Sequence, residues 1–189
     1  MAIHVNIQFG GYPQHPQFQG NPDPLWGYFS AVAGHDGQIE ATELQACLTR
    51  ANFHGSFTPF SLETCRVMIT MLDRDFSGKM GFNEFKELWG CLSQWKQTFI
   101  NFDRDRSGTM DAHELAAVVR SFGYNLSPQA FHVLLKRYAK AGGHITFDDF
   151  VALCVRLRAL SDAFKRRDQM KNGTATFQYD DFLRCTLCL

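Results

Sequence analysis

Apolar residues recur along most of the chain at the three- and four-residue spacing of amphipathic helices, and short polar loops interrupt them. The loops align on a central glycine, and in four of the five a sizeable apolar side chain follows two positions later. The glycines are Gly37, Gly78, Gly108, Gly143 and Gly173, and the residues two positions later are Ile39, Met80, Met110, Ile145 and Ala175. This repeat of helix, polar loop and helix predicts an all-α protein of five EF-hand helix-loop-helix units.

The segments between the loops predict how the hands pair. We expect paired loops to run side by side and to touch through a short antiparallel β-contact at the apolar position. Residues 82–102 and 147–167 contain no proline, which predicts one long helix in each segment. Residues 53–59 and 123–128 contain glycine and proline, and turns of this kind let neighbouring hands fold back on each other. Hand one should therefore pair with hand two and hand three with hand four, leaving the fifth hand unpaired.

The first 22 residues differ from the rest of the chain. They contain glycine, proline, glutamine and asparagine without a periodic apolar pattern, which predicts a flexible segment. Asp23 and Pro24 then have the character of a helix cap and a first helical residue. The predicted organisation is a flexible segment at 1–22 and a folded domain of EF-hands at 23–189.

Charge and cysteine usage narrow the possible partners and compartments. Lys plus Arg and Asp plus Glu each number 19, and without a basic surplus no nucleic-acid partner is expected. The N-terminus lacks the pattern of a secretory signal, and no apolar run reaches the ~18 residues of a membrane span. The six cysteines lie scattered in apolar helical contexts. We therefore expect reduced thiols and a cytoplasmic protein.

The third loop, from Asp103 to Glu114, has the full ligand pattern of a calcium-binding EF-hand. Calcium takes six to eight oxygens, and a twelve-residue loop supplies them from positions 1, 3, 5, 7, 9 and 12, with glycine at 6. The candidate ligands are Asp103, Asp105, Ser107, the carbonyl of Thr109, Asp111 and Glu114. Four of them are carboxylates, and this spacing predicts a calcium site.

The second loop, from Asp73 to Glu84, matches the same pattern with one carboxylate fewer. Its candidate ligands are Asp73, Asp75, Ser77, the carbonyl of Lys79 and Glu84. Gly81 at position 9 offers no side-chain oxygen, so a water is expected to complete the shell there.

The first loop is one residue shorter and carries fewer charged ligands. Its candidate ligands are the carbonyl of Ala33, Asp36, the carbonyl of Gln38 and Glu43, completed by waters. By charge alone it is a weaker calcium site, and His35 is expected to face solvent.

The fourth and fifth loops lack essential oxygens. Lys140 and Gly142 stand at ligand positions of the fourth loop, which is predicted to serve as a structural partner of the third. In the fifth loop Met170 stands at position 3 and Tyr179 replaces the closing glutamate, so it should bind calcium poorly.

Several stretches of the chain are far more specific than a single loop motif. With its five hands and an eleven-residue first loop that begins at alanine, the chain resembles the penta-EF-hand family over roughly residues 24–189. Motifs similar to its sorcin and grancalcin branch are DPLWGYF at 23–29, AVAG at 31–34, PFSLETCR at 59–66, MGFNEFKELW at 80–89 and LRAL at 157–160.

The resemblance implies a calcium sensor and adaptor without catalytic activity. It implies Ca²⁺ at the matching positions of the first three loops, exposure of apolar surface on calcium binding, and a homodimer formed through the fifth hands. A heterodimer with another penta-EF-hand chain is the alternative assembly. Implied targets include annexins and calcium channels of internal membranes, with reversible association of a cytoplasmic protein with those membranes.

Two other functions stay open at this point. As in the calpain-like branch, the chain could be the regulatory subunit of a protease, with its fifth hand paired to a catalytic chain. A passive calcium buffer is the other alternative. Trp89 and Trp95 fit either the core or a target groove, and the calcium response of their emission separates a sensor from a buffer.

Overall fold

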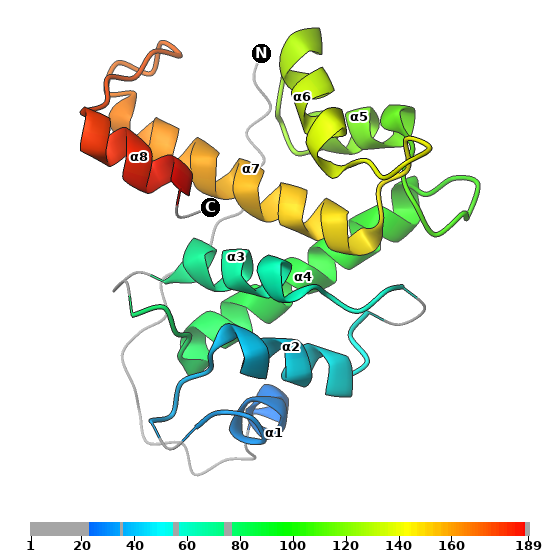
Figure 1. Cartoon of the computed structure of the whole chain (residues 1–189), viewed down its shortest axis with the longest axis vertical. Coiled ribbons are helices and arrows are strands. Elements are labelled where there is room, and N and C mark those ends of the chain that lie inside the picture. The colour runs from blue at the N-terminus through cyan, green and yellow to red at the C-terminus, as the bar shows by residue number, and fades with distance from the viewer. Residues whose placement is uncertain (1–22, 35, 55–56, 74–76, 188–189) are drawn as a thin grey trace.

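The computed structural model describes residues 23–34, 36–54, 57–73 and 77–187, so the predicted flexible segment at 1–22 lies outside the described residues. Helices dominate the fold, and the described residues contain no strand longer than an isolated bridge (Figure 1). The helices are α1 (Pro24–Ser30), α2 (Ala41–Arg50), α3 (Leu62–Leu72), α4 (Phe82–Phe102), α5 (Ala112–Ser121), α6 (Pro128–Tyr138), α7 (Phe147–Arg167) and α8 (Tyr179–Leu187). The all-α prediction is confirmed.

The helix boundaries follow local capping chemistry. The Asp23 side chain accepts a hydrogen bond from the backbone N–H of Leu25, and Pro24 takes the first position of α1. Ser61 caps α3 and Ser127 caps α6 in the same way. The two segments without proline form the single helices α4 and α7, with the predicted bounds.

Loop pairing places the hands two by two. Ile39 and Met80 form an antiparallel bridge between the first and second loops, and Met110 and Ile145 form one between the third and fourth. All four side chains are at most 1% exposed, so the bridges also bring the loops onto the core. These contacts confirm that hand one pairs with hand two and hand three with hand four.

Two long helices join the hands into one core. α4 runs diagonally from the part of the molecule that holds α1, α2 and α3 to the part that holds α5 and α6, and α8 lies beside α7 (Figure 1). Aromatic rings fill the junction: Phe99 lies 5.3 Å from both Phe147 and Phe150, and Phe57 lies 4.9 Å from Phe147, centroid to centroid. Packing of this kind restricts how far one hand can move without moving its neighbours.

The two tryptophans of α4 also belong to the interior. Trp95 is 9% exposed, and Trp89 lies between Tyr28, Phe53 and Phe85 with ring centroids 5.0 to 5.7 Å away. Trp89 therefore reports on the packing of α1 against α4. In the described part of the chain no helix has the length and apolarity needed to cross a bilayer.

Candidate metal centres

The third loop brings three carboxylates together at the junction of α4 and α5. Asp103 ends α4, Glu114 lies in the first turn of α5, and Asp105 lies between them. One oxygen from each lies within 4.8 Å of the others, and Asp103 is buried. Three converging carboxylates repel one another unless a cation joins them, and their hard oxygen donors suit Ca²⁺. The third loop therefore fits a calcium ion.

Backbone N–H groups hold these carboxylates in place. The two carboxylate oxygens of Asp103 accept hydrogen bonds from the N–H groups of Ser107 and Gly108, both at 2.9 Å. Asp105 accepts from Ser107, and hydrogen bonds from Ser107 hold the pKa of Asp105 below its ordinary value. Gly108 has a φ of +74°, a left-handed conformation that a side chain would strain, so the bend depends on glycine.

Of the remaining predicted ligands of this loop, the Ser107 hydroxyl adjoins the cluster, 3.4 Å from Asp103 Oδ1. The Ser107 hydroxyl lies 2.9 Å from the Thr109 carbonyl. One oxygen of Asp111 accepts hydrogen bonds from the N–H groups of His113 and Glu114, so Asp111 caps α5 and lies outside the three-carboxylate cluster. Its carboxylate orients Glu114 through the backbone of the helix that carries it.

The second loop repeats the arrangement of the third. Asp73 ends α3, and its two oxygens accept hydrogen bonds from the N–H groups of Ser77 and Gly78 at 3.0 and 2.8 Å. Glu84, in the first turn of α4, accepts from the N–H of Gly81 at 2.9 Å. Asp75, the predicted ligand at position 3, lies outside the described residues.

The first loop brings its two candidate carboxylates close to one glycine. A Cβ built on Gly34 would lie 3.3 Å from Asp36 Oδ1 and 3.8 Å from Glu43 Oε1, so the absence of a side chain leaves a small oxygen-lined space. Glu43 also accepts a hydrogen bond from the Glu40 N–H at 2.8 Å. The Ala33 and Gln38 carbonyls belong to the same turn, and the Gln38 carbonyl accepts from the Gly34 N–H at 3.2 Å. His35 is outside the described residues.

A lysine from the second loop reaches this site. Lys79 Nζ lies 2.8 Å from Asp36 Oδ2 and 3.3 Å from Glu40 Oε1. The hydrogen bond from Lys79 lowers the pKa of Asp36, and its bonds to Asp36 and Glu40 raise the pKa of Lys79. Sequence reasoning assigned only the backbone carbonyl of Lys79. The sequence signal for the side-chain contact was Glu40, an acidic residue that the predicted β-bridge places opposite Lys79.

Basic side chains also engage acidic groups of the two loops that lack ligands. In the fourth loop Lys140 Nζ lies 3.0 Å from Asp149 Oδ2. In the fifth hand Arg167 forms a two-pronged ion pair with Asp181, one of the two aspartates that follow Tyr179. Asp168 nevertheless accepts hydrogen bonds from the N–H groups of Asn172 and Gly173, as Asp103 does from the corresponding residues of the third loop.

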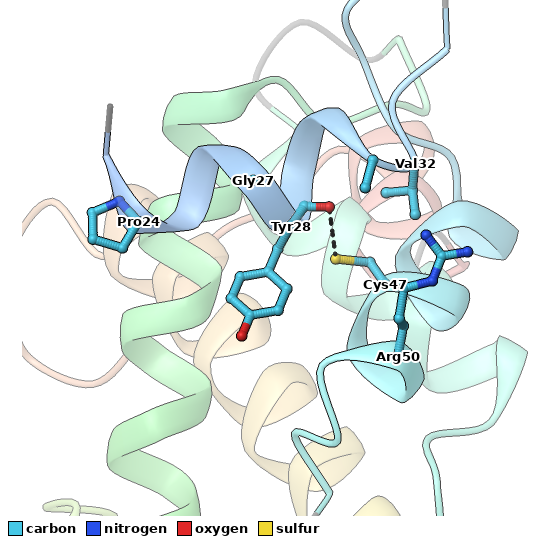
Figure 2. A pocket seen from close by; sticks show the side chains of 7 residues that line it. Pro24, Gly27, Tyr28, Val32, Cys47 and Arg50 are labelled. Carbon is cyan, nitrogen blue, oxygen red and sulfur yellow. Dashed lines mark hydrogen bonds between the residues drawn. The ribbon is translucent and has the colours of Figure 1, made fainter. Parts of the chain in front are cut away.

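Hand one also borders an apolar hollow of about 460 Å³ between α1 and α2. Figure 2 shows Pro24, Tyr28, Val32 and Arg50 around it. The Cys47 thiol donates a hydrogen bond to the Tyr28 carbonyl at 3.4 Å and ties α2 to α1 (Figure 2). Because α1 and α2 flank the first loop, the shape of the hollow depends on the angle that this loop sets.

Comparison with known proteins matches these features to EF-hand proteins. An EF-hand domain pair matches residues 35–90, and a single EF hand matches residues 96–119. Sorcin from Homo sapiens is 57% identical, with 95% of this chain and 90% of sorcin covered. Grancalcin from Mus musculus is 52% identical, with 97% of this chain and 85% of grancalcin covered.

A less similar relative and a solved structure agree with this assignment. Calpain small subunit 1 from Mus musculus is 37% identical, with 84% of this chain and 60% of that protein covered. A solved structure of a homolog of programmed cell death 6 protein from Leishmania major Friedlin has a TM-score of 0.63 and 30% identity, and the match covers 88% of this chain and 94% of that one.

The paired loops, the three-carboxylate cluster and the identity to relatives over nearly the whole chain lead to one assignment. The chain belongs to the penta-EF-hand family of calcium-binding proteins, in the branch that contains sorcin and grancalcin.

Proposed function

We propose that this chain is a cytoplasmic calcium-regulated adaptor that changes shape on binding Ca²⁺ and then attaches to target proteins or membranes. The observation that carries the proposal is the convergence of Asp103, Asp105 and Glu114 where α4 meets α5. We assign the chain a regulatory rather than a catalytic role, which its similarity to sorcin and grancalcin supports.

α4 is the element that connects the second and third loops. It carries Glu84 in its first turn, and Asp103 follows its last residue as the C-cap, so candidate ligands stand at both of its ends. A bound Ca²⁺ supplies the positive charge that holds such carboxylates together. A bound ion would join the end of α4 to the start of α5 through the carboxylates of the third loop. In the second loop it would join the end of α3 to the start of α4 through Asp73 and Glu84. A change of helix angle at one loop is therefore passed along α4 to the other.

A calcium titration of the full chain tests this proposal. Trp89 packs against Tyr28 of α1, so a change in the angle between α1 and α4 should alter tryptophan emission. We expect emission and the binding of an apolar dye to change together at micromolar free calcium. If calcium binds while both signals stay constant, the chain acts as a passive buffer and the adaptor proposal fails.

The fifth hand supports a dimer. Within the described residues its loop forms no bridge to another loop, and α8 buries none of its side chains. Met170, Tyr179 and Leu187 are 84%, 74% and 76% exposed. We propose that two fifth hands pair and cover this surface, since a large exposed apolar patch commonly marks an interface. The alternative is a heterodimer with another penta-EF-hand chain, including the catalytic chain of a calpain-like protease.

The proposed targets are annexins, calcium channels and membrane surfaces. Sedimentation of the chain with phospholipid vesicles, and capture of purified annexin, should each require calcium. The molar mass measured by light scattering distinguishes a homodimer from a chain that pairs only with another protein. A homodimer favours the adaptor. A monomer that associates only with a protease chain favours a regulatory subunit, which the lower identity to calpain small subunit 1 makes the weaker candidate.

A further inference from the structure

The side chain of Lys79 crosses from the second loop to the first. Its ammonium lies 2.8 Å from Asp36 Oδ2 and 3.3 Å from Glu40 Oε1. The first loop has two charged candidate ligands, Asp36 and Glu43. Asp36 is the one near the centre of the loop. Of the two carboxylates that Lys79 contacts, one is thus a candidate calcium ligand and the other is not.

The β-bridge sets this contact. Ile39 pairs with Met80 in antiparallel register, which puts Glu40 opposite Lys79. The backbone carbonyl of Lys79 remains on the second loop, where the Ser77 hydroxyl lies 3.4 Å from it. A single residue therefore contributes a candidate ligand to one loop and a positive charge to the other.

The second pair of loops makes no equivalent ion pair within the described residues. Its bridge joins Met110 and Ile145, and the same register puts His144 of the fourth loop, the counterpart of Lys79, opposite Asp111 of the third. Asp111 instead accepts hydrogen bonds from the backbone N–H groups of His113 and Glu114, so among the described loops the lysine contact belongs to the first pair.

We propose that Lys79 is a positioning residue that competes with calcium for Asp36 and so makes the first loop fill after the second. Without calcium the ammonium holds Asp36. When the first loop takes calcium, Asp36 releases the ammonium to bind the ion, and the ammonium stays with Glu40. The inference rests on the proposed role of the first loop as a calcium site.

The expected effect is modest because the contact is partly exposed. The Lys79 and Asp36 side chains are 34% and 48% exposed, and ion pairs of this kind contribute little in water. The ammonium competes with a doubly charged ion, and its positive charge repels that ion more than it would a monovalent one. This increases the effect of Lys79 on calcium affinity. We expect removal of the charge to tighten calcium binding at the first loop by about three- to tenfold, and less at high salt.

Calcium titration of the ¹⁵N-labelled full chain tests the inference, with Lys79→Met as the variant. The backbone amide of Gly37 reports on the first loop and that of Gly78 on the second. In the parent the Gly37 midpoint should lie at higher calcium than the Gly78 midpoint. In Lys79→Met the ratio of the two midpoints should fall about three- to tenfold. Lys136→Met, which removes an exposed lysine of α6, changes net charge equally and should leave the ratio unchanged.

Two results overturn the inference in distinguishable ways. If both loops fill and the ratio is the same in the parent and in Lys79→Met, or changes as much in Lys136→Met, Lys79 does not compete for Asp36. If the Gly37 amide does not respond to millimolar calcium in any of the three proteins, the first loop is not a calcium site, and its proposed role fails together with the inference.

Discussion

Lys140 Nζ lies 3.0 Å from Asp149 Oδ2. The fourth loop therefore pairs the carboxylate at its closing position with a lysine of the same loop. Asp149 is the counterpart of Glu114 in the third loop, and its side chain is only 17% exposed. In the third loop the corresponding carboxylate belongs to the three-carboxylate cluster. The fourth loop can therefore stay folded as the partner of the third without a metal ion.

Removal of the Lys140 charge should destabilise the calcium-free protein. Lys140→Met leaves Asp149 with Thr146 as its remaining side-chain partner, and the half-exposed pair should contribute at most about 1 kcal/mol to the free energy of unfolding. Urea unfolding in the presence of a chelator measures the loss. The double variant Lys140→Met/Asp149→Asn should recover part of it, and an equal loss in both proteins would contradict a specific pair.

Asp111 and Glu114 should differ in what they control. Asp111 caps α5, so Asp111→Ala should lower the free energy of unfolding of the calcium-free protein by about 1 kcal/mol. Glu114→Gln should instead weaken calcium binding at the third loop by more than about tenfold, because it removes a charged member of the cluster. Chemical unfolding and calcium titration of both variants test whether Asp111 controls stability and Glu114 controls calcium affinity. Equal losses of affinity would show that Asp111 is as important to the ion as Glu114.

Buried thiols should make the protein less stable at alkaline pH. Burial raises the pKa of Cys47 to about 11 and that of Cys65 to about 12, from an ordinary value of 9.0. Above pH 9 the unfolded thiols lose their protons while the folded ones keep them. The stability that is fully present below pH 9 is therefore lost as pH rises toward those folded values, by about 1.4 kcal/mol per pH unit for each thiol.

Urea unfolding between pH 8 and pH 10.5, with reductant and chelator, measures this slope. Cys65→Ala should reduce the slope, whatever it does to stability at pH 8. A slope that is the same in the variant would show that other groups cause the alkaline loss.

The fifth-hand surface should control assembly. Tyr179→Asp and Phe182→Asp place charges on residues of α8 that are 74% and 49% exposed, so they should separate the proposed dimer without unfolding the chain. Light scattering should then give about half the mass of the parent, with unchanged helix content by circular dichroism. A parent that is already monomeric would contradict the proposed homodimer.

The helices and the pairing of hands were predictable because they depend on local patterns. Helix starts are indicated by residues that favour the N-cap position, here Asp23, Ser61 and Ser127. The proline-free stretch at 82–102 is one helix. The sizeable apolar residue two positions after each of the first four central glycines indicated the bridges, since a buried side chain there needs a neighbouring loop. These features involve few residues, close together in the chain.

The ion pairs within and between loops were not predictable by the same route. Lys79 and Asp36 are far apart in sequence, and their contact depends on the register of the bridge and on the length of the lysine side chain. Position and spacing predicted Asp111 as a ligand, and that stays a prediction. Its cap of α5 depends on where that helix begins. For Lys140 a signal was present, because a lysine and an aspartate stand at positions 3 and 12 of one loop.

The most direct test of the account is equilibrium dialysis of the full chain against micromolar free calcium. The second and third loops should each take up one ion, and Glu84→Gln/Glu114→Gln should lose most of that uptake while keeping its helix content. No uptake by the parent at micromolar free calcium, or full uptake by the double variant, would contradict the account.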